Sequence, residues 1–389
     1  MNHPWIALSP PIEIDGKSLV DQLTCDIINE LNPDQAFQIL SFHLDRLDDV
    51  NIHGKLTLIR IDDYFELDWE YSWWQPDLRL SGGVKRVTQL AERHPGTQSL
   101  ILTSCIGMEY ARSRYDNLRW ISLEGMLLMQ TYGDLMLLKD HDCSRPLISL
   151  SRIIRPNRAM MLSLLFARRL DQIGQITAVG IDACPQNIMD FVNWQFDDRL
   201  DLVSDVQQGW KLLRDNKESV RGEQPYHITP GTQAIREWDN TSNWQRLRDR
   251  YQYSRLEIIN EPLFSEPFMI VTEKYPFSVT AANLPVFVAP AGTVAYYRSQ
   301  GFDVFDDIID HSYDLQENPL LRMESVIAQI QRLTQDTDQL DRAWKSCLER
   351  FQKNYQHLQT SQERYRQKIL ESARHYNQQL NIPATPRGS

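Results

Sequence analysis

Three consecutive polar residues, Thr272, Glu273 and Lys274, follow a short apolar run at Phe268–Val271 and precede a helical pattern that starts at Tyr275. A buried parallel strand would deliver these side chains to its carboxyl end, which is where open α/β sheets bind ligands. The helix that follows would present its N-terminal amides and positive dipole end to an anion. Lysine suits a diphosphate, and glutamate can accept both hydroxyls of a ribose. The pattern therefore predicts a nucleotide diphosphate site, although it also occurs as a simple helix cap.

A longer order of motifs surrounds these residues, between Glu257 and Asp314. A glutamate-bearing strand precedes the strand that ends in Thr-Glu-Lys, and a helix, a proline-led apolar strand and a Gly-Phe-x-x-Phe stretch ending in Ser-Tyr-Asp follow. In this order the segment resembles the C-terminal domain of GT-B glycosyltransferases related to the α-1,3-fucosyltransferases and their phage and bacterial relatives. The matching residues are Glu261, Thr272, Glu273, Lys274, Pro285, Gly292, Gly301, Phe302, Phe305, Asp310, Ser312, Tyr313 and Asp314.

The resemblance implies a donor site for a nucleotide diphosphate sugar, in which Glu273 holds the ribose and Lys274 the diphosphate. Glu261 and Thr272 belong to the same implied site. Members of the family commonly carry a Lys or Arg three residues after the lysine of Thr-Glu-Lys, where this chain has Phe277. The resemblance thus predicts donor chemistry and leaves open which sugar and nucleotide are bound.

A second stretch, ISLSRIIRPNRAMMLSLLFARRL, looks like the first strand, Arg-x-x-Arg loop and first helix of the same domain. By this resemblance Arg155 and Arg158 face the nucleotide phosphates, and bidentate guanidinium contacts suit that task. The alternative is that these arginines cap carbonyl groups or pair with acids. Together the two matches cover roughly residues 146–180 and 256–316, and residues 1–145 carry no such motif.

Transfer of a sugar from such a donor places two demands on the chain. The departing diphosphate must be stabilised, and an inverting reaction must deprotonate the acceptor hydroxyl. The predicted phosphate-facing cations can meet the first demand, so no metal or other cofactor is expected. Three strand-end acids are candidates for the catalytic base, namely Asp62 and Asp63 after the run Leu56–Ile61, and Glu109 after Leu100–Thr103. Such acids also cap following helices, which is the alternative.

Two aromatic segments leave the acceptor open among a glycan, a protein and DNA. Residues 62–74 set aromatic rings among acids, which suits either a stacking platform or an edge that covers the core. Between Arg236 and Arg255, five arginines alternate with Trp and Tyr, which suits either a nucleic-acid acceptor or an ordinary amphipathic helix. The DNA alternative is a phage-type enzyme that glycosylates a hydroxymethylated base. A rival is a non-catalytic assembly protein on a degenerate transferase fold, which oligomerises through its long C-terminal helix.

Composition places the chain among folded globular proteins of two domains. Its 389 residues are 42% hydrophobic, 10% aromatic and 24% charged. A formal net charge of −11 argues against a chain-wide electrostatic grip on nucleic acid. The N-terminus lacks a signal-peptide pattern and no apolar run is long enough for a membrane span, so a cytoplasmic protein is expected. The five scattered cysteines predict neither a disulfide framework nor a zinc ribbon.

Short apolar runs alternate with helical patterns along most of the chain. This alternation predicts an α/β fold with largely parallel sheets. The predicted strands are Phe37–Phe42, Leu56–Ile61, Leu100–Thr103, Leu135–Leu138, Leu147–Leu150, Ile176–Ile181, Leu256–Ile259, Phe268–Val271 and Val286–Ala289.

A polar segment that ends in Pro146 divides these strands into two sets. We therefore expect two Rossmann-like domains of GT-B type. An N-terminal acceptor-side domain spans 1–143, and a C-terminal nucleotide-sugar domain spans 144–318 with a helical insertion at about 183–250. From 319 to 384, apolar residues at helical spacing predict a long amphipathic helix. This helix either kinks and packs back across both domains, or part of it pairs with another chain as a coiled coil and forms a homo-oligomer.

Overall fold

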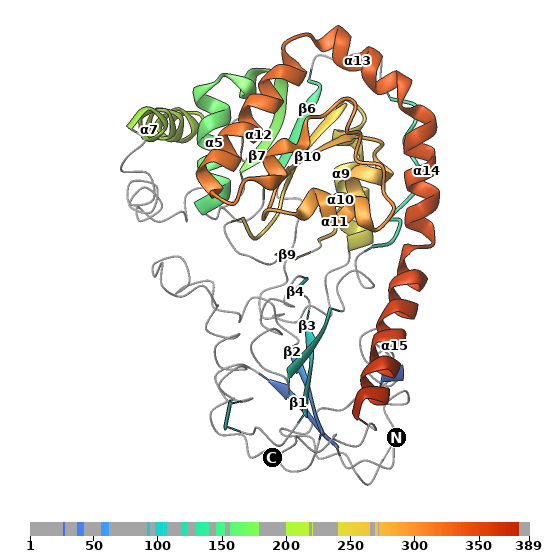
Figure 1. Cartoon of the computed structure of the whole chain (residues 1–389). Helices are drawn as coiled ribbons and strands as arrows, with labels where there is room; N and C mark the ends of the chain where they lie inside the picture. The colour runs from blue at the N-terminus through green and yellow to red at the C-terminus, as the bar shows by residue number, and fades with distance from the viewer. Residues whose placement is uncertain are drawn as a thin grey trace. The chain divides into compact units, whose positions relative to one another are not determined.

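The computed structural model describes most residues from 129 to 380 and only separate short elements before them (Figure 1). The described residues are 26–27, 37–42, 56–61, 92–93, 98–103, 105–106, 118–122, 129–139, 145–151, 156–178, 200–217, 220, 240–264, 269–270 and 272–380. The chain divides into two compact units, which we call unit 1 (Met1–Gln130 with Thr360–Ser389) and unit 2 (Thr131–Gln359).

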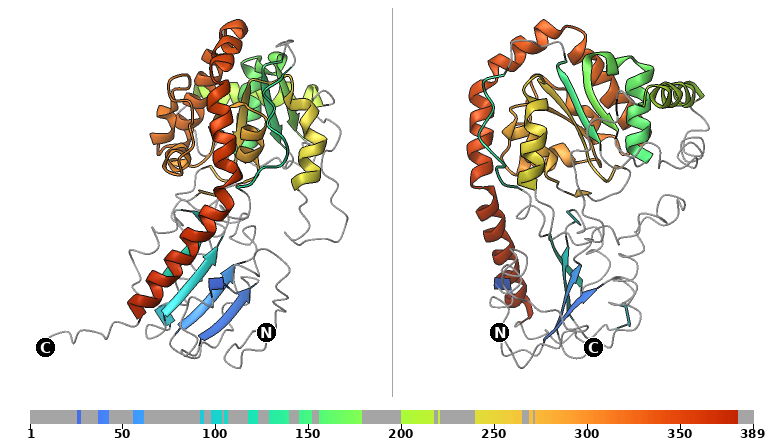
Figure 2. Two further views of the ribbon diagram at one scale, coloured as in Figure 1. Left: turned by 90° about the vertical axis from the view of Figure 1, so that its right-hand side faces the viewer. Right: turned by 180° about the vertical axis from the view of Figure 1, so that it is seen from behind.

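Unit 1 contains a sheet whose described strands all run parallel. In spatial order they are β1 (Phe37–Phe42), β2 (Leu56–Ile61), β3 (Gln98–Thr103) and β5 (Leu118–Ser122). Helix α15 (Ser361–Leu380) packs beside β5 in the same unit (Figure 2), and its Ile369 and Ala373 are buried. Arg366 of this helix pairs with Asp26, with 2.7 Å between Nη2 and Oδ2. The end of the chain thus returns to unit 1 and buries apolar surface there.

Unit 2 is built on a second parallel sheet, whose central strands are almost entirely buried. In spatial order its described strands are β10 (Leu284–Val288), β8 (Leu256–Asn260), β6 (Leu147–Ser151) and β7 (Gly174–Ala178). The chain runs from β6 outward to β7 and then returns to the other side of β6 for β8 and β10. The strand order therefore reverses between β6 and β8, whose carboxyl ends flank a topological switch point.

Helices cover both faces of the unit 2 sheet (Figure 1). They include α5 (Pro156–Ala167), α7 (Leu200–Asp215), α9 (Asn240–Tyr251), α10 (Lys274–Thr280) and α12 (Pro319–Thr334). Right-handed crossovers place α5 and α10 on opposite faces, because α5 leads to β7 and α10 leads the other way to β10. α7 and α12 pack on α5. On the other face, α9 and α10 form one buried cluster with β6 that includes Trp244, Tyr251 and Phe277.

The C-terminal segment forms four helices rather than the single long helix that the sequence predicts. α12 is followed by α13 (Thr337–Ser346), α14 (Leu348–Gln359) and α15. The first break comes where Asp336 caps α13, its side chain accepting a hydrogen bond from Gln339 N at 2.9 Å. Trp344 Nε1 of α13 donates to Ala282 O at 2.5 Å, and α14 contacts α10. The expected back-packing is therefore present, and the homo-oligomer stays a prediction.

Short elements complete the described structure. They are β4 (Cys105–Ile106), the 3₁₀ helix η3 (Leu170–Ile173), β9 (Met269–Ile270), α11 (Thr293–Ser299) and the 3₁₀ helix η6 (His311–Leu315). Within the described ranges, every helix is too short or too polar to cross a membrane.

The structure confirms the α/β class with parallel sheets, and β1 and β2 have the predicted bounds. The strand predicted at Leu135–Leu138 is wrong. This segment lies on α10, where Met136 N donates to Thr280 O at 3.0 Å, and Leu138 is 97% exposed. Strand β5 was not predicted, because Arg119 interrupts its apolar run.

Residues 131–139, which the sequence assigns to the N-terminal domain, belong to unit 2 and pack against its other residues. The rings of Tyr132 and Phe277 meet edge to face with centroids 4.8 Å apart. Lys139 Nζ donates to Ser254 O at 2.7 Å. These contacts hold the segment on unit 2, and the domain bounds near residue 143 stay a prediction.

Candidate functional site

The structure brings the described residues of the predicted donor site together at the switch point of unit 2. Arg158 lies in the first turn of α5, which follows β6 in the chain, and Glu261 follows the last residue of β8. Thr272, Glu273 and Lys274 stand at the start of α10, as the sequence predicts. The site therefore lies at the carboxyl ends of β6 and β8, where this kind of sheet binds ligands.

A threonine hydroxyl links a cation to a buried acid in this site. Thr272 Oγ1 donates to Glu261 Oε2 at 2.7 Å, and Lys274 Nζ donates to Thr272 Oγ1 at 3.0 Å. Lys274 Nζ also lies 3.7 Å from Glu261 Oε2 and 3.7 Å from Glu273 Oε1. The lysine side chain is 19% exposed, whereas both glutamates are buried. The ammonium group is thus held at the rim of the site by three oxygen-bearing side chains.

Burial raises the pKa of Glu261 above its usual value, and the nearby charge of Glu273 adds to this effect. Lys274, the hydrogen bond from Thr272 and the charge of Arg158 act in the opposite direction and lower this pKa. The second carboxylate oxygen, Glu261 Oε1, is buried and has no hydrogen-bond partner among the described residues. Glu261 is therefore an acid whose protonation state depends on the charges that surround it.

Two side chains at the start of α5 bind the end of β8. Arg158 Nη2 donates to Asn260 O at 3.2 Å, and Asn157 Nδ2 donates to Glu261 O at 3.1 Å. Arg158 thus caps a carbonyl group, which is the alternative that the sequence left open. Its contact with a phosphate stays a prediction.

Asparagines are the part of this site that the sequence interpretation missed. Asn157 Oδ1 and both side-chain polar atoms of Asn260 are buried without a hydrogen-bond partner among the described residues. An unsatisfied buried amide is costly, so a water molecule or a ligand group is expected beside each. The available signal was the position of Asn260, directly before Glu261 at a strand end.

Four of the predicted site residues lie outside the described residues. They are the acids Asp62, Asp63 and Glu109 and the arginine Arg155. Their roles as catalytic base and phosphate ligand stay predictions.

Helix α10, which follows the site, ends at Thr280, whereas the helical pattern in the sequence runs from Tyr275 to Asn283. α10 has seven residues, and its first amide, Lys274 N, donates to Thr272 Oγ1 at 3.4 Å. The N-terminus of so short a helix adds little to the attraction of an anion. The charged side chains of the site supply that attraction instead.

Phe277, at the position where the predicted resemblance would place a cation, faces the core. It is 1% exposed, and its ring centroid lies 5.4 Å from that of Trp244. Trp244 and Tyr251 of α9 are equally buried, while Arg246 and Arg248 are exposed. α9 is thus an ordinary amphipathic helix, whose buried rings are not available to stack on bases.

The Ser-Tyr-Asp stretch that contributes to the resemblance is structural. Asp314 accepts hydrogen bonds from two backbone amides at the start of α11, at 3.0 and 3.1 Å. Tyr313 Oη pairs with His311 Nδ1 at 2.8 Å, and His311 Nε2 pairs with Val304 O at 2.8 Å. Because Val304 O can only accept, Nε2 carries the proton, and burial lowers the pKa of this histidine. The structure therefore gives His311 a structural role.

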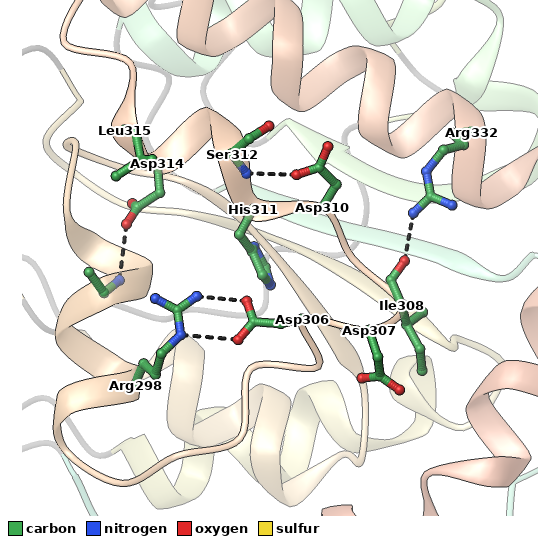
Figure 3. A pocket seen from close by; sticks show the side chains of 11 residues that line it. Arg298, Asp306, Asp307, Ile308, Asp310, His311, Ser312, Asp314, Leu315 and Arg332 are labelled. Carbon is green, nitrogen blue, oxygen red and sulfur yellow. Dashed lines mark hydrogen bonds and ion pairs between the residues drawn. The ribbon is translucent and has the colours of Figure 1, made fainter.

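A cavity of about 550 Å³ lies between α11, η6 and the end of α12 (Figure 3). Its charged walls are paired within the chain: Arg298 binds Asp306 at 2.6 Å, and Arg332 donates to Ile308 O at 2.5 Å. Asp310 accepts from Ser312 N at 2.9 Å. None of the described donor-site residues lines it.

Across the described parts of the chain, no group of three or more His, Cys, Asp or Glu side chains is placed to bind a metal ion. Comparisons of the chain with protein-family models, with curated proteins and with solved structures give no match. The function must therefore be inferred from the groups at the switch point, where a buried acid and buried amides lie beside two cations.

Proposed function

We propose that the chain is a glycosyltransferase that moves a sugar from a nucleotide diphosphate sugar to an acceptor hydroxyl. The observation that carries the proposal is the bonded group Glu261, Thr272 and Lys274, with Arg158 close by, at the switch point of a parallel sheet. A buried group with cations for phosphates and a carboxylate for ribose hydroxyls fits such a donor.

In this proposal Lys274, Arg158 and Arg155 bind the diphosphate and stabilise the charge that develops when it leaves, without a metal. Glu273 holds the ribose. The bond between the sugar anomeric carbon and the phosphate oxygen breaks, and a bond from that carbon to the acceptor oxygen forms. Among the strand-end acids of unit 1, Asp62, Asp63 or Glu109 takes the acceptor proton.

The proposed architecture is a GT-B enzyme of two Rossmann-like domains, with the donor in unit 2 and the acceptor in unit 1. The parallel sheet in each unit supports this proposal. A glycan, a protein and a hydroxymethylated DNA base can each supply the acceptor hydroxyl that this reaction requires. The buried rings of α9 do not favour a hydroxymethylated DNA base.

Calorimetry tests the proposed donor site with a panel of UDP-glucose, UDP-N-acetylglucosamine, GDP-mannose and GDP-fucose. We expect at least one to bind, and Lys274→Ala to weaken its affinity about tenfold or more, which corresponds to about 1.4 kcal/mol. Lys353→Ala is the control, because Lys353 is 69% exposed and pairs with Glu349 on α14. Absence of binding by the whole panel contradicts the proposal, as does equal binding by Lys274→Ala. Either result would favour the rival prediction, a non-catalytic protein that oligomerises through its C-terminal helix.

A further inference from the structure

Lys274, the proposed diphosphate ligand, already has two carboxylates beside it. Its Nζ lies 3.7 Å from an oxygen of Glu261 and 3.7 Å from an oxygen of Glu273. An arriving anion therefore competes with charges that the protein itself supplies. Unless one carboxylate changes its state, the attraction of Lys274 for a diphosphate is largely cancelled.

The two carboxylates differ in their surroundings. Glu273 lies nearer the rim, with a side chain that is 10% exposed, whereas the Glu261 side chain is 1% exposed. Glu261 Oε2 accepts a hydrogen bond from the Thr272 hydroxyl group, but Oε1 is buried without a hydrogen-bond partner among the described residues. A buried oxygen that receives no hydrogen bond is the most favourable place for a proton. Glu261 is therefore the acid that a change of local charge will affect first.

The polar and charged groups that face Glu261 come from α5 and from the start of α10. Lys274 and Glu273 stand at the start of α10, Arg158 projects from α5, and Thr272 supplies its hydroxyl dipole. In the unliganded protein the two cations favour the charged carboxylate, while burial and Glu273 oppose it. A diphosphate brings two negative charges and draws the field of both cations toward itself. Both changes favour the neutral carboxyl group.

We propose that Glu261 takes up one proton from solvent when a nucleotide diphosphate sugar binds, so that Lys274 can direct its charge to the diphosphate. The inference rests on the proposed function. The proton resides on Glu261 Oε1, and no covalent bond of the ligand changes. Because binding consumes a proton, the affinity falls as the pH rises, by up to tenfold per pH unit, until the bound form also loses its proton.

Calorimetry in two buffers of different ionisation enthalpy, PIPES and Tris at the same pH, measures this proton directly. The probe is the tightest-binding member of the panel named above, because a diphosphate esterified at both ends does not titrate near neutral pH. We expect the wild-type protein to take up a fraction of a proton to one proton per site. We also expect the dissociation constant to increase between pH 6.5 and 8.5.

Glu261→Gln keeps the shape and the acceptor for Thr272 but cannot take up a proton. We expect this variant to bind without proton uptake and with an affinity that does not change with pH. Glu257→Gln is the matched control. Glu257 is another buried glutamate and belongs to β8, which ends just before Glu261. It lies four residues away, or about 13 Å along the chain, toward the amino end. This control should keep the proton uptake of the wild-type protein.

The outcomes separate this inference from the function on which it rests. Binding by the wild-type protein with no proton uptake contradicts the role of Glu261 and leaves the proposed function standing. Uptake that persists in Glu261→Gln also contradicts it, because another group must then take the proton. Failure of every panel member to bind contradicts the proposed function itself. If Glu261→Gln does not fold, the wild-type measurement still keeps the inference falsifiable, because binding without proton uptake contradicts it.

Discussion

Replacement of Glu257 by glutamine should change how the stability of unit 2 depends on pH. Glu257 is 3% exposed in β8 and accepts a hydrogen bond from Tyr251 Oη at 2.8 Å. Burial raises the pKa of Glu257 to about 7, although the charge of Lys139 and hydrogen bonds from neighbouring side chains oppose the rise. At neutral pH this carboxyl group is therefore poised between its two protonation states.

The size of the effect follows from the two pKa values. The folded value of about 7 exceeds the ordinary 4.5 by about 2.5, and each pKa unit corresponds to about 1.4 kcal/mol. Between these values the folded state binds more protons than the unfolded state. The contribution of Glu257 to stability is thus fully present below pH 4.5, and about 3 kcal/mol of it is lost as the pH rises through 7.

Urea denaturation at pH 5, 6, 7 and 8, followed by tryptophan fluorescence, measures this loss. The glutamine variant stays neutral, so its free energy of unfolding should rise relative to that of the wild-type protein by about 2.5 kcal/mol from pH 5 to pH 8. Glu349→Gln is the control, since that side chain is exposed on α14. A wild-type minus variant difference that does not change with pH would refute the reasoning. A difference of opposite sign would mean that Lys139 keeps Glu257 ionised.

Three further substitutions test the packing of unit 2. Gly209→Ala should cost about 1–3 kcal/mol in chemical denaturation, because its Cβ would lie 1.8 Å from Ser163 O and force α5 and α7 apart; an unchanged midpoint would contradict that close approach. Asp314→Ala should lower the thermal midpoint and cost about 1–2 kcal/mol, because it removes the acceptor for two amides of α11; equal midpoints would mean that the cap contributes nothing. Phe277→Arg should unfold unit 2, since a buried cation replaces a core ring. A folded Phe277→Arg protein with tighter nucleotide-sugar binding would show that this position faces the ligand.

Local patterns in the sequence predicted the elements whose partners lie close by in the chain. The runs at Phe37–Phe42 and Leu56–Ile61 form strands because continuous apolar runs suit a parallel sheet. Leu135–Leu138 has a similar composition but binds α10 through its backbone, which composition does not reveal. The apolar spacing after residue 319 predicted the buried side of the C-terminal helices. The break at Asp336 depends on a capping hydrogen bond that the spacing does not show.

In the candidate site too, the sequence predicted the residues that are neighbours in the chain and missed those that strand pairing brings together. Thr272, Glu273 and Lys274 are consecutive, so one strand and one helix start were enough to predict that they lie together. Asn157 reaches Glu261 O, at the end of β8, only because β8 pairs with β6 across a long stretch of chain. Such pairing depends on the strand order, which the sequence alone did not establish.

Release of nucleoside diphosphate from the nucleotide-sugar panel tests the central claim most directly. The assay compares the wild-type protein with Lys274→Ala and with Lys353→Ala, in the presence of glycan, protein or hydroxymethylated DNA acceptors. The proposal predicts release by the wild-type protein and by Lys353→Ala, and a rate at least tenfold lower for Lys274→Ala, which corresponds to about 1.4 kcal/mol of transition-state stabilisation. No release from any donor, or equal release by Lys274→Ala, would contradict a glycosyltransferase site at this position.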